Sequence, residues 1–134
     1  MAQEIEGRVA QLLEGKNFVH VATVRQNGKP HIVPVWVDHE DGKVVLNTAE
    51  GRAWPANLRR NGNATLNVMN LENPYEYVEI EAELAEDTKD GADEHIDKMA
   101  KKYLGEDKYP FRQDGEERVI MRLQPLKIRH NNPG

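Results

Sequence analysis

The chain has 134 residues, of which 38% are hydrophobic and 31% charged, and its formal net charge is −5. This length predicts one domain, residues 1–134, with a single modest core. The acidic balance excludes a uniformly basic nucleic-acid footprint, and the absence of cysteine excludes disulfides and thiol chemistry. No apolar run is long enough to span a membrane, and the acidic start is unlike a signal peptide. A cytoplasmic protein that binds neither nucleic acid nor membrane is therefore expected.

The first third of the chain predicts a helix followed by a hairpin. Apolar residues recur at helical spacing over about residues 3–14, and Gly15 ends that helix. Residues 18–24 read as a strand with few charges. An Asn-Gly pair then predicts a tight turn into a return strand at 30–37, which places His20 and His31 where they could face each other.

The remaining elements follow from turn residues and periodicity. An Asp-Gly pair predicts a second hairpin turn, and the run Asn61-Gly62-Asn63 ends a short helix. Strict alternation of apolar residues with glutamates marks the longest strand, and Thr88 or Asp90 is expected to cap the helix after it. The predicted elements are strands at 44–48, 64–69, 75–85, 118–123 and 126–130, and helices at about 53–60 and 91–103. Short strands in hairpin order with few helices predict a small antiparallel barrel.

The common catalytic patterns are absent. Serine does not occur in the sequence, which excludes a serine hydrolase, and there is neither a Walker loop nor a Gly-x-Gly-x-x-Gly turn. The five histidines are scattered without the spacing of metal ligands, so no metal site is predicted.

A phosphate site is one interpretation of the turn between the strand at 44–48 and the short helix. Thr48 offers a hydroxyl at the strand end, Gly51 permits a close approach, and Arg52 lies at the helix start, where backbone N–H groups add positive potential. The alternative is an ordinary strand-to-helix turn with a surface arginine.

The return strand and the later tyrosines also allow two interpretations each. Pro34 lacks an N–H and interrupts a ladder, so it marks either a bulge or a stretch of unpaired backbone that faces a ring edge. Trp36 is expected to fill the core or a dimer interface. Tyr75 and Tyr77 share one face of their strand and either stack on a ring across a subunit interface or pack that interface.

Several segments together resemble the split β-barrel flavin and deazaflavin oxidoreductases, also called pyridoxamine 5'-phosphate oxidase-like proteins. The Asn-Leu-Arg-Arg element at 57–60 is the most specific, and it resembles the branch that uses the deazaflavin coenzyme F-420. The segments that carry the resemblance are residues 18–24, 28–37, 47–61, 73–82 and 102–110.

The resemblance implies a mainly β fold with α, a six- to seven-stranded antiparallel split β-barrel flanked by short helices. It also implies a homodimer with the cofactor at the interface, and transfer of a hydride between F-420 and an unsaturated organic substrate. Because the ring performs the chemistry, no catalytic side chain is assigned, and Tyr77 and solvent are alternative proton donors. The resemblance implies ring contacts from the backbone near Val33, Pro34 and Val35. It implies phosphate contacts from Asn47, Thr48 and Arg52, with Tyr75 and Tyr77 nearby, and Gly51 joins the predicted site from the turn described above.

One departure from the family pattern concerns the phosphate. The family commonly has a lysine two residues after Arg52, where this chain has Trp54 followed by Pro55. The Trp54 indole is expected to cover a ring or narrow the entrance. The alternatives are therefore an FMN-binding protein of the same fold, or a dimer that binds another aromatic or apolar ligand without catalysis.

Overall fold

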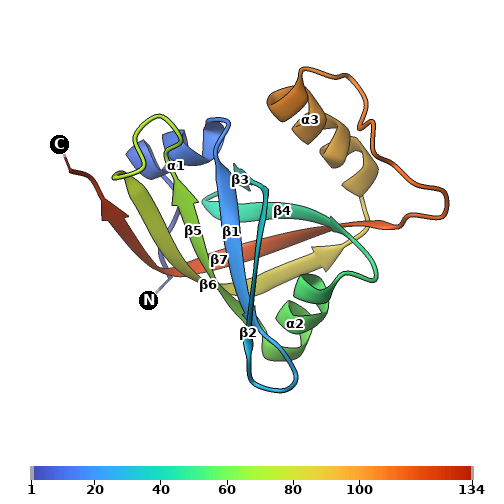
Figure 1. The fold of residues 1–134 in the computed structure, drawn as a ribbon, viewed down its shortest axis with the longest axis horizontal. Coiled ribbons are helices and arrows are strands. Elements are labelled where there is room, and N and C mark those ends of the chain that lie inside the picture. Colours follow the sequence, from blue (N-terminus) through green and yellow to red (C-terminus); the bar gives the residue numbers. More distant parts are fainter. Residues whose placement is uncertain (1, 134) are drawn as a thin grey trace.

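The computed structural model describes residues 2–133, which form seven strands and three helices (Figure 1). In chain order the elements are α1 (Gly7–Glu14), β1 (Phe18–Val24), β2 (Pro30–Trp36), β3 (Asp38–Glu40), β4 (Lys43–Ala49), α2 (Ala53–Asn61), β5 (Asn63–Met69), β6 (Tyr77–Thr88), α3 (Ala92–Leu104) and β7 (Arg118–Asn131).

The strands form one sheet in the order β2-β1-β5-β6-β7-β4-β3, and every neighbouring pair is antiparallel. The sheet curls into a half-barrel around the core, with α1 near one end and α2 near the other (Figure 1). This confirms the predicted antiparallel split β-barrel, with seven strands.

The alternation in β6 divides core from solvent as predicted. Val78, Ile80 and Ala82 are at most 1% exposed and belong to the core, whereas Glu79 and Glu81 on the other face pair with an arginine of β7. Burial of such apolar side chains is the main favourable term in folding.

Strand β2 is a regular edge strand, so the interpretation of Pro34 as the site of a bulge is wrong. β2 pairs only with β1, and the register runs without a shift from Phe18 opposite Trp36 to Val24 opposite Pro30. Pro34 therefore causes no bulge, because an edge strand tolerates a residue that cannot donate on its open side.

The strand predicted to end at 123 continues to Asn131, which corrects the division into two strands. The pairing of β6 with β7 shifts between Glu81 and Ala82 and again between Leu84 and Glu86. An extra residue in one partner at each shift bends the pair, which lets the sheet curl without breaking the strand.

Three smaller predictions also change. Helix α1 begins at Gly7 rather than near residue 3. Gly91 precedes α3 without a side-chain cap, because the Thr88 hydroxyl accepts a hydrogen bond from the N–H of Asp90 instead. His20 lies opposite Pro34 and not opposite His31.

Helix α3 covers the face of the sheet that points away from the core. Val45 and Ile120 meet Ala92 of this helix in a small separate apolar cluster. The alternate residues of β4, Val44 and Leu46, belong to the main core. Successive residues of β4 therefore face the main core and the α3 side in turn. Only the residues on the α3 side can reach a ligand bound there.

Candidate functional site

A cavity of about 320 Å³ lies among β1, β2, β4, the start of α2, α3 and the segment that leads into β7. Its lining is predominantly apolar, with a few polar side chains on one side, which is the usual make-up of a small-molecule site. The apolar lining residues are Phe18, Pro34, Val35, Trp36, Ile96 and Met99; Tyr109 and Phe111 come from the segment after α3, and the remaining residues are Asn47, Arg52 and Arg118.

The aromatic lining residues of this cavity are Phe18, Trp36, Tyr109 and Phe111, and the first two stack on Tyr103, which is not itself a lining residue. Trp36 stacks on Tyr103 of α3, with centroids 5.0 Å apart and planes 6° apart. Tyr109 meets Trp36 edge to face at 6.0 Å and meets Phe111 in the same manner at 5.7 Å. Phe111 is 61% exposed and so stands at the margin. Flat, fixed rings suit an aromatic ligand, because they add stacking to apolar burial.

The polar side consists of an amide and a buried guanidinium that hold each other. The Nε of Arg118 donates to the Asn47 Oδ1 at 2.9 Å, and its Nη1 donates to the Glu116 Oε1 at 2.7 Å. The guanidinium also lies 5.1 Å from the centroid of Tyr109. Arg118 is 4% exposed and its charge is balanced by the buried ion pair with Glu116, so it presents held N–H groups to the cavity and not an unpaired positive charge.

Arg52 is the second cation of the site and the more accessible one. It occupies the N-cap position of α2, is exposed, and makes no hydrogen bond or ion pair within the described range 2–133. Burial raises the pKa of the nearby Glu116 carboxyl. The hydrogen bond from Arg118 and the charges of Arg118 and Arg52 act in the opposite direction and outweigh burial, so the pKa lies below its usual value. A guanidinium at a helix start is well placed to meet a phosphate.

A second hollow, of about 480 Å³, adjoins the cavity and shares Arg52, Tyr109 and Phe111 with it. Its other lining residues include Glu50 and Glu116. Arg52 therefore lies where the two hollows meet, and the carboxylates of Glu50, Asp114 and Glu116 line the second one.

The structure brings together four of the residues expected from the sequence. Pro34, Val35, Asn47 and Arg52 all line the cavity. Val33 precedes them on β2 and packs against the core.

Gly51 allows the turn before α2, because its φ of +96° is a conformation that side chains disfavour.

Thr48 and Trp54 lie elsewhere, which corrects the roles expected of their side chains. Thr48 is 0% exposed and on the core side of β4, while its neighbour Asn47 faces α3. Trp54 is 2% exposed within the core cluster, so the indole neither covers the cavity nor narrows its entrance. The Thr48 Oγ1 and the Trp54 Nε1 have no hydrogen-bond partner in the described part of the chain.

The two tyrosines lie far from this cavity within one chain. Tyr77 begins β6 opposite Asn131, at the end of β7 remote from the lining residue Arg118, and Tyr75 precedes it. Tyr75 is 76% exposed and Tyr77 is 39% exposed. They can meet a cavity only in another copy of the chain.

Sequence reasoning missed Arg118, Tyr109 and Phe111 as lining residues. Arg118 shares a strand face with Ile120, and a buried arginine beside an apolar residue indicates that another element covers that face. Tyr109 and Phe111 lie outside any helix or strand, so no periodicity identifies them.

Residues 2–133 hold neither a cluster of metal ligands nor a membrane-spanning helix. No group of three histidine, aspartate or glutamate side chains there could hold a metal ion. None of the three helices is long and apolar enough to cross a membrane.

Comparison with known proteins supports the same kind of fold. A family model described as pyridoxamine 5'-phosphate oxidase matches residues 5–132. No curated protein matches the chain.

Three solved structures illustrate the range of similar folds. An F420 reductase has 23% identity and a TM-score of 0.77, over 89% of this chain and 94% of that one. A conserved hypothetical protein from Mycobacterium tuberculosis has 18% identity and a TM-score of 0.71, over 98% and 88%. An FMN-binding protein from Syntrophomonas wolfei has 16% identity and a TM-score of 0.63, over 85% and 76%.

Proposed function

Because the chain belongs to the pyridoxamine 5'-phosphate oxidase family, we propose that it is an oxidoreductase that transfers a hydride between coenzyme F-420 and an unsaturated organic substrate. The observation that carries this proposal is the cavity itself. It joins an aromatic, apolar wall to two arginines, one buried and one accessible.

The residues of the cavity fit a flat ring with an anionic tail. Pro34 and Val35 lie on a strand with an open edge, so backbone groups there are free of a second strand and could meet polar atoms at a ring edge. Arg118 has N–H groups beyond those it donates to Asn47 and Glu116, and these face the cavity wall. The amide N–H groups of Asn47 are held by Ala92 and His95, so this residue would offer its Oδ1 to a ligand. Arg52 is placed for the tail. The lysine common in the family is absent, so Arg52 would carry more of the interaction with phosphate.

When bound, F-420 supplies the ring carbon that gives or accepts the hydride. The protein would bind and orient the ring through the β2 edge and Asn47. Tyr109 and Phe111 would keep water from it. Described side chains include no Ser-His-Asp or metal arrangement, which agrees with chemistry carried by a cofactor.

FMN binding is the second candidate. The aromatic wall and the guanidinium groups suit either ring, and a similar fold is found in an FMN-binding protein. The absent lysine near Arg52 affects a phosphate monoester and a longer anionic tail alike.

Parallel titration of the purified protein with F-420 and with FMN tests the proposal. We expect a colourless protein as purified that shifts or quenches the fluorescence of added F-420 and binds it more tightly than FMN. A yellow protein with the FMN absorption bands would favour the second candidate. Failure to respond to either compound would reject both and favour a ligand-binding protein without redox activity.

We also propose that the active form is a homodimer. Tyr75, Tyr77 and Ile32 are large exposed side chains, and a second copy would bury such surface. Light scattering with size-exclusion chromatography should give twice the mass of 15.3 kDa. A monomer at micromolar concentration would reject this part. The cytoplasmic location stays a prediction.

A further inference from the structure

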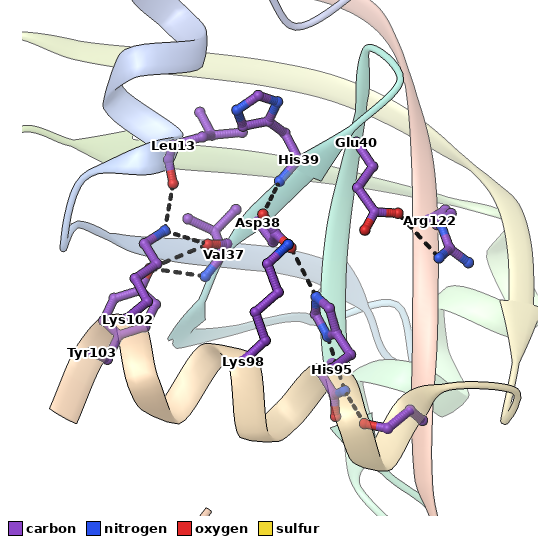
Figure 2. Close-up of polar contacts among 12 residues, drawn as sticks. Leu13, Val37, Asp38, His39, Glu40, His95, Lys98, Lys102, Tyr103 and Arg122 are labelled. Atoms are coloured by element: carbon purple, nitrogen blue, oxygen red, sulfur yellow. Dashed lines mark hydrogen bonds and ion pairs between the residues drawn. The ribbon is translucent and has the colours of Figure 1, made fainter. Parts of the chain in front are cut away.

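A chain of buried polar side chains runs from β3, through α3, to the cavity wall. The His95 Nε2 lies 3.0 Å from the Asp38 Oδ2 (Figure 2). The His95 Nδ1 lies 3.1 Å from the Asn47 Nδ2. The Asn47 Oδ1 accepts from the Nε of Arg118. Asp38, His95 and Arg118 are each at most 9% exposed, so the chain is largely shielded from water.

The partners of Asn47 fix the direction of its amide. Its Nδ2 lies 2.9 Å from the carbonyl oxygen of Ala92, which can only accept, and its Oδ1 lies 2.9 Å from the Arg118 Nε, which can only donate. Exchanging the amide oxygen and nitrogen would turn both contacts into repulsions. Nδ2 is therefore the atom that points at His95.

This direction in turn fixes the protonation of His95. An amide N–H₂ donates, so the Nδ1 of His95 must accept, and it carries no proton. The proton of a neutral imidazole is then on Nε2, from which it is donated to Asp38. The arrangement is complete only with His95 neutral and in this tautomer.

The charged groups around His95 come from several elements. Asp38 of β3 accepts from His95 and also from Lys98, one turn further along α3, whose Nζ is 3.1 Å away. Arg118 of β7 and its partner Glu116 lie beyond Asn47, and β4 itself presents only that uncharged amide. Burial raises the pKa of the Asp38 carboxyl, but hydrogen bonds from His95, Lys98 and the N–H of His39 outweigh it and hold the pKa well below its usual range. Asp38 thus stays ionised whether His95 is neutral or charged.

We propose that His95 is a positioning residue of the cavity, and that its neutral, Nε2-protonated form holds Asn47 and Arg118 in their ligand-binding arrangement. A second proton on His95 would face the N–H₂ of Asn47. The amide must then turn or withdraw, and the Nε of Arg118 loses its acceptor. Ligand affinity therefore falls when His95 becomes charged. This proposal takes the identity of the ligand from the proposed function, but the hydrogen-bond arrangement stands without it.

The arrangement is tested first without any ligand, by ¹⁵N NMR of the histidine rings in the wild-type protein. We expect His95 to show a protonated Nε2 and an unprotonated Nδ1 near neutral pH. As the pH falls, protonation of His95 should shift the Arg118 Nε–H signal at the same midpoint. Any of three results would overturn the proposal. They are a protonated Nδ1 at neutral pH, an Arg118 Nε–H signal that does not change when His95 is protonated, and a His95 that stays neutral until the protein unfolds.

The effect on the cavity is tested by titration of FMN and of F-420 into the wild type, His95→Gln and His130→Gln. Across the His95 midpoint found by NMR, wild-type affinity should fall about tenfold relative to His95→Gln, on the scale of one hydrogen bond to a charged group. The FMN phosphate itself titrates near pH 6, but it does so equally with all three proteins. The ratio of wild-type affinity to variant affinity at each pH therefore cancels the effect of the phosphate.

His130→Gln is the matched control, because His130 also pairs with a carboxylate, that of Glu76, but does not line the cavity. It should keep the wild-type pH dependence. The same pH dependence in His95→Gln would overturn the proposal. Absence of binding by any of the three proteins would reject the proposed function instead, and the NMR experiment would then decide this inference alone.

Discussion

Replacement of Arg52 tests the anionic-tail hypothesis most directly. Arg52 is exposed and makes no hydrogen bond or ion pair within residues 2–133, so Arg52→Ala removes no contact that the fold needs. The free energy of unfolding should change by no more than about 0.5 kcal/mol. Any loss of cofactor binding in this variant is then a property of the site.

The expected loss of binding follows from the kind of contact. A hydrogen bond between a guanidinium and a phosphate or carboxylate contributes about 1.5–3 kcal/mol, or about 10- to 150-fold in the dissociation constant. Solvent screening at an exposed side chain favours the lower half of that range. The assay is fluorescence titration with F-420, and with FMN, at two salt concentrations.

Arg59→Ala is the matched control, since it removes the same charge from the same helix. Arg59 already pairs with Glu50 and Asp87 and does not line the cavity. Its variant also leaves Glu50, which lines the adjoining hollow, without that ion pair, so a small loss of affinity is expected, clearly below the loss in Arg52→Ala. Equal affinity in Arg52→Ala and the wild type would refute the assignment of Arg52 to the tail, as would equal losses in both variants.

Three further predictions concern the core, the acid stability and the subunit interface. Trp54→Ala should lower the free energy of unfolding, measured in urea, by about 3–5 kcal/mol, because the indole is 2% exposed in the core. Trp54→Phe should lower it much less, because this change keeps a ring in the core and removes a buried N–H that has no partner among residues 2–133. Equal effects of the two substitutions would contradict this. Hydrogen bonds from Arg8, Asn70 and His130 lower the pKa of the Glu76 carboxyl to about 2. Its contribution to stability is therefore complete above the unfolded pKa of about 4.3 and is lost as the pH falls toward 2. The free energy of unfolding should depend less on pH between 5 and 2 in Glu76→Gln than in the wild type, and parallel curves would argue against this role of Glu76. Tyr75→Ala should leave the stability of one chain within about 0.5 kcal/mol while it weakens dimerisation in sedimentation, and an unchanged dimer would remove Tyr75 from the interface.

Local patterns in the sequence account for most of the fold, because turns and periodicity depend on neighbouring residues. The alternation over 78–84 is the period of a strand with one buried face, and the structure buries that face. Asp41 and Gly42 both adopt positive φ angles in their turn, as an Asp-Gly hairpin requires. Gly62 ends α2 in the left-handed conformation.

Order within the sheet is beyond such patterns, because it depends on contacts distant in the sequence. Pro34 is a local signal that allows either an edge position or a bulge, and only the pairing of β2 with β1 alone, in regular register, shows that the edge position is the answer. The single long β7 likewise depends on bulges in its pairing with β6.

The candidate site divides in the same way between sequence and tertiary structure. Arg52 was identifiable from the sequence, because a strand end, a glycine and a helix start are adjacent along the chain. Asn47 and Thr48 are also adjacent, but only the packing of α3 over one sheet face shows that the first reaches the cavity and the second the core. Arg118 and His95 join the site from distant segments, since a buried charge or imidazole must find its hydrogen-bond partners wherever the fold supplies them.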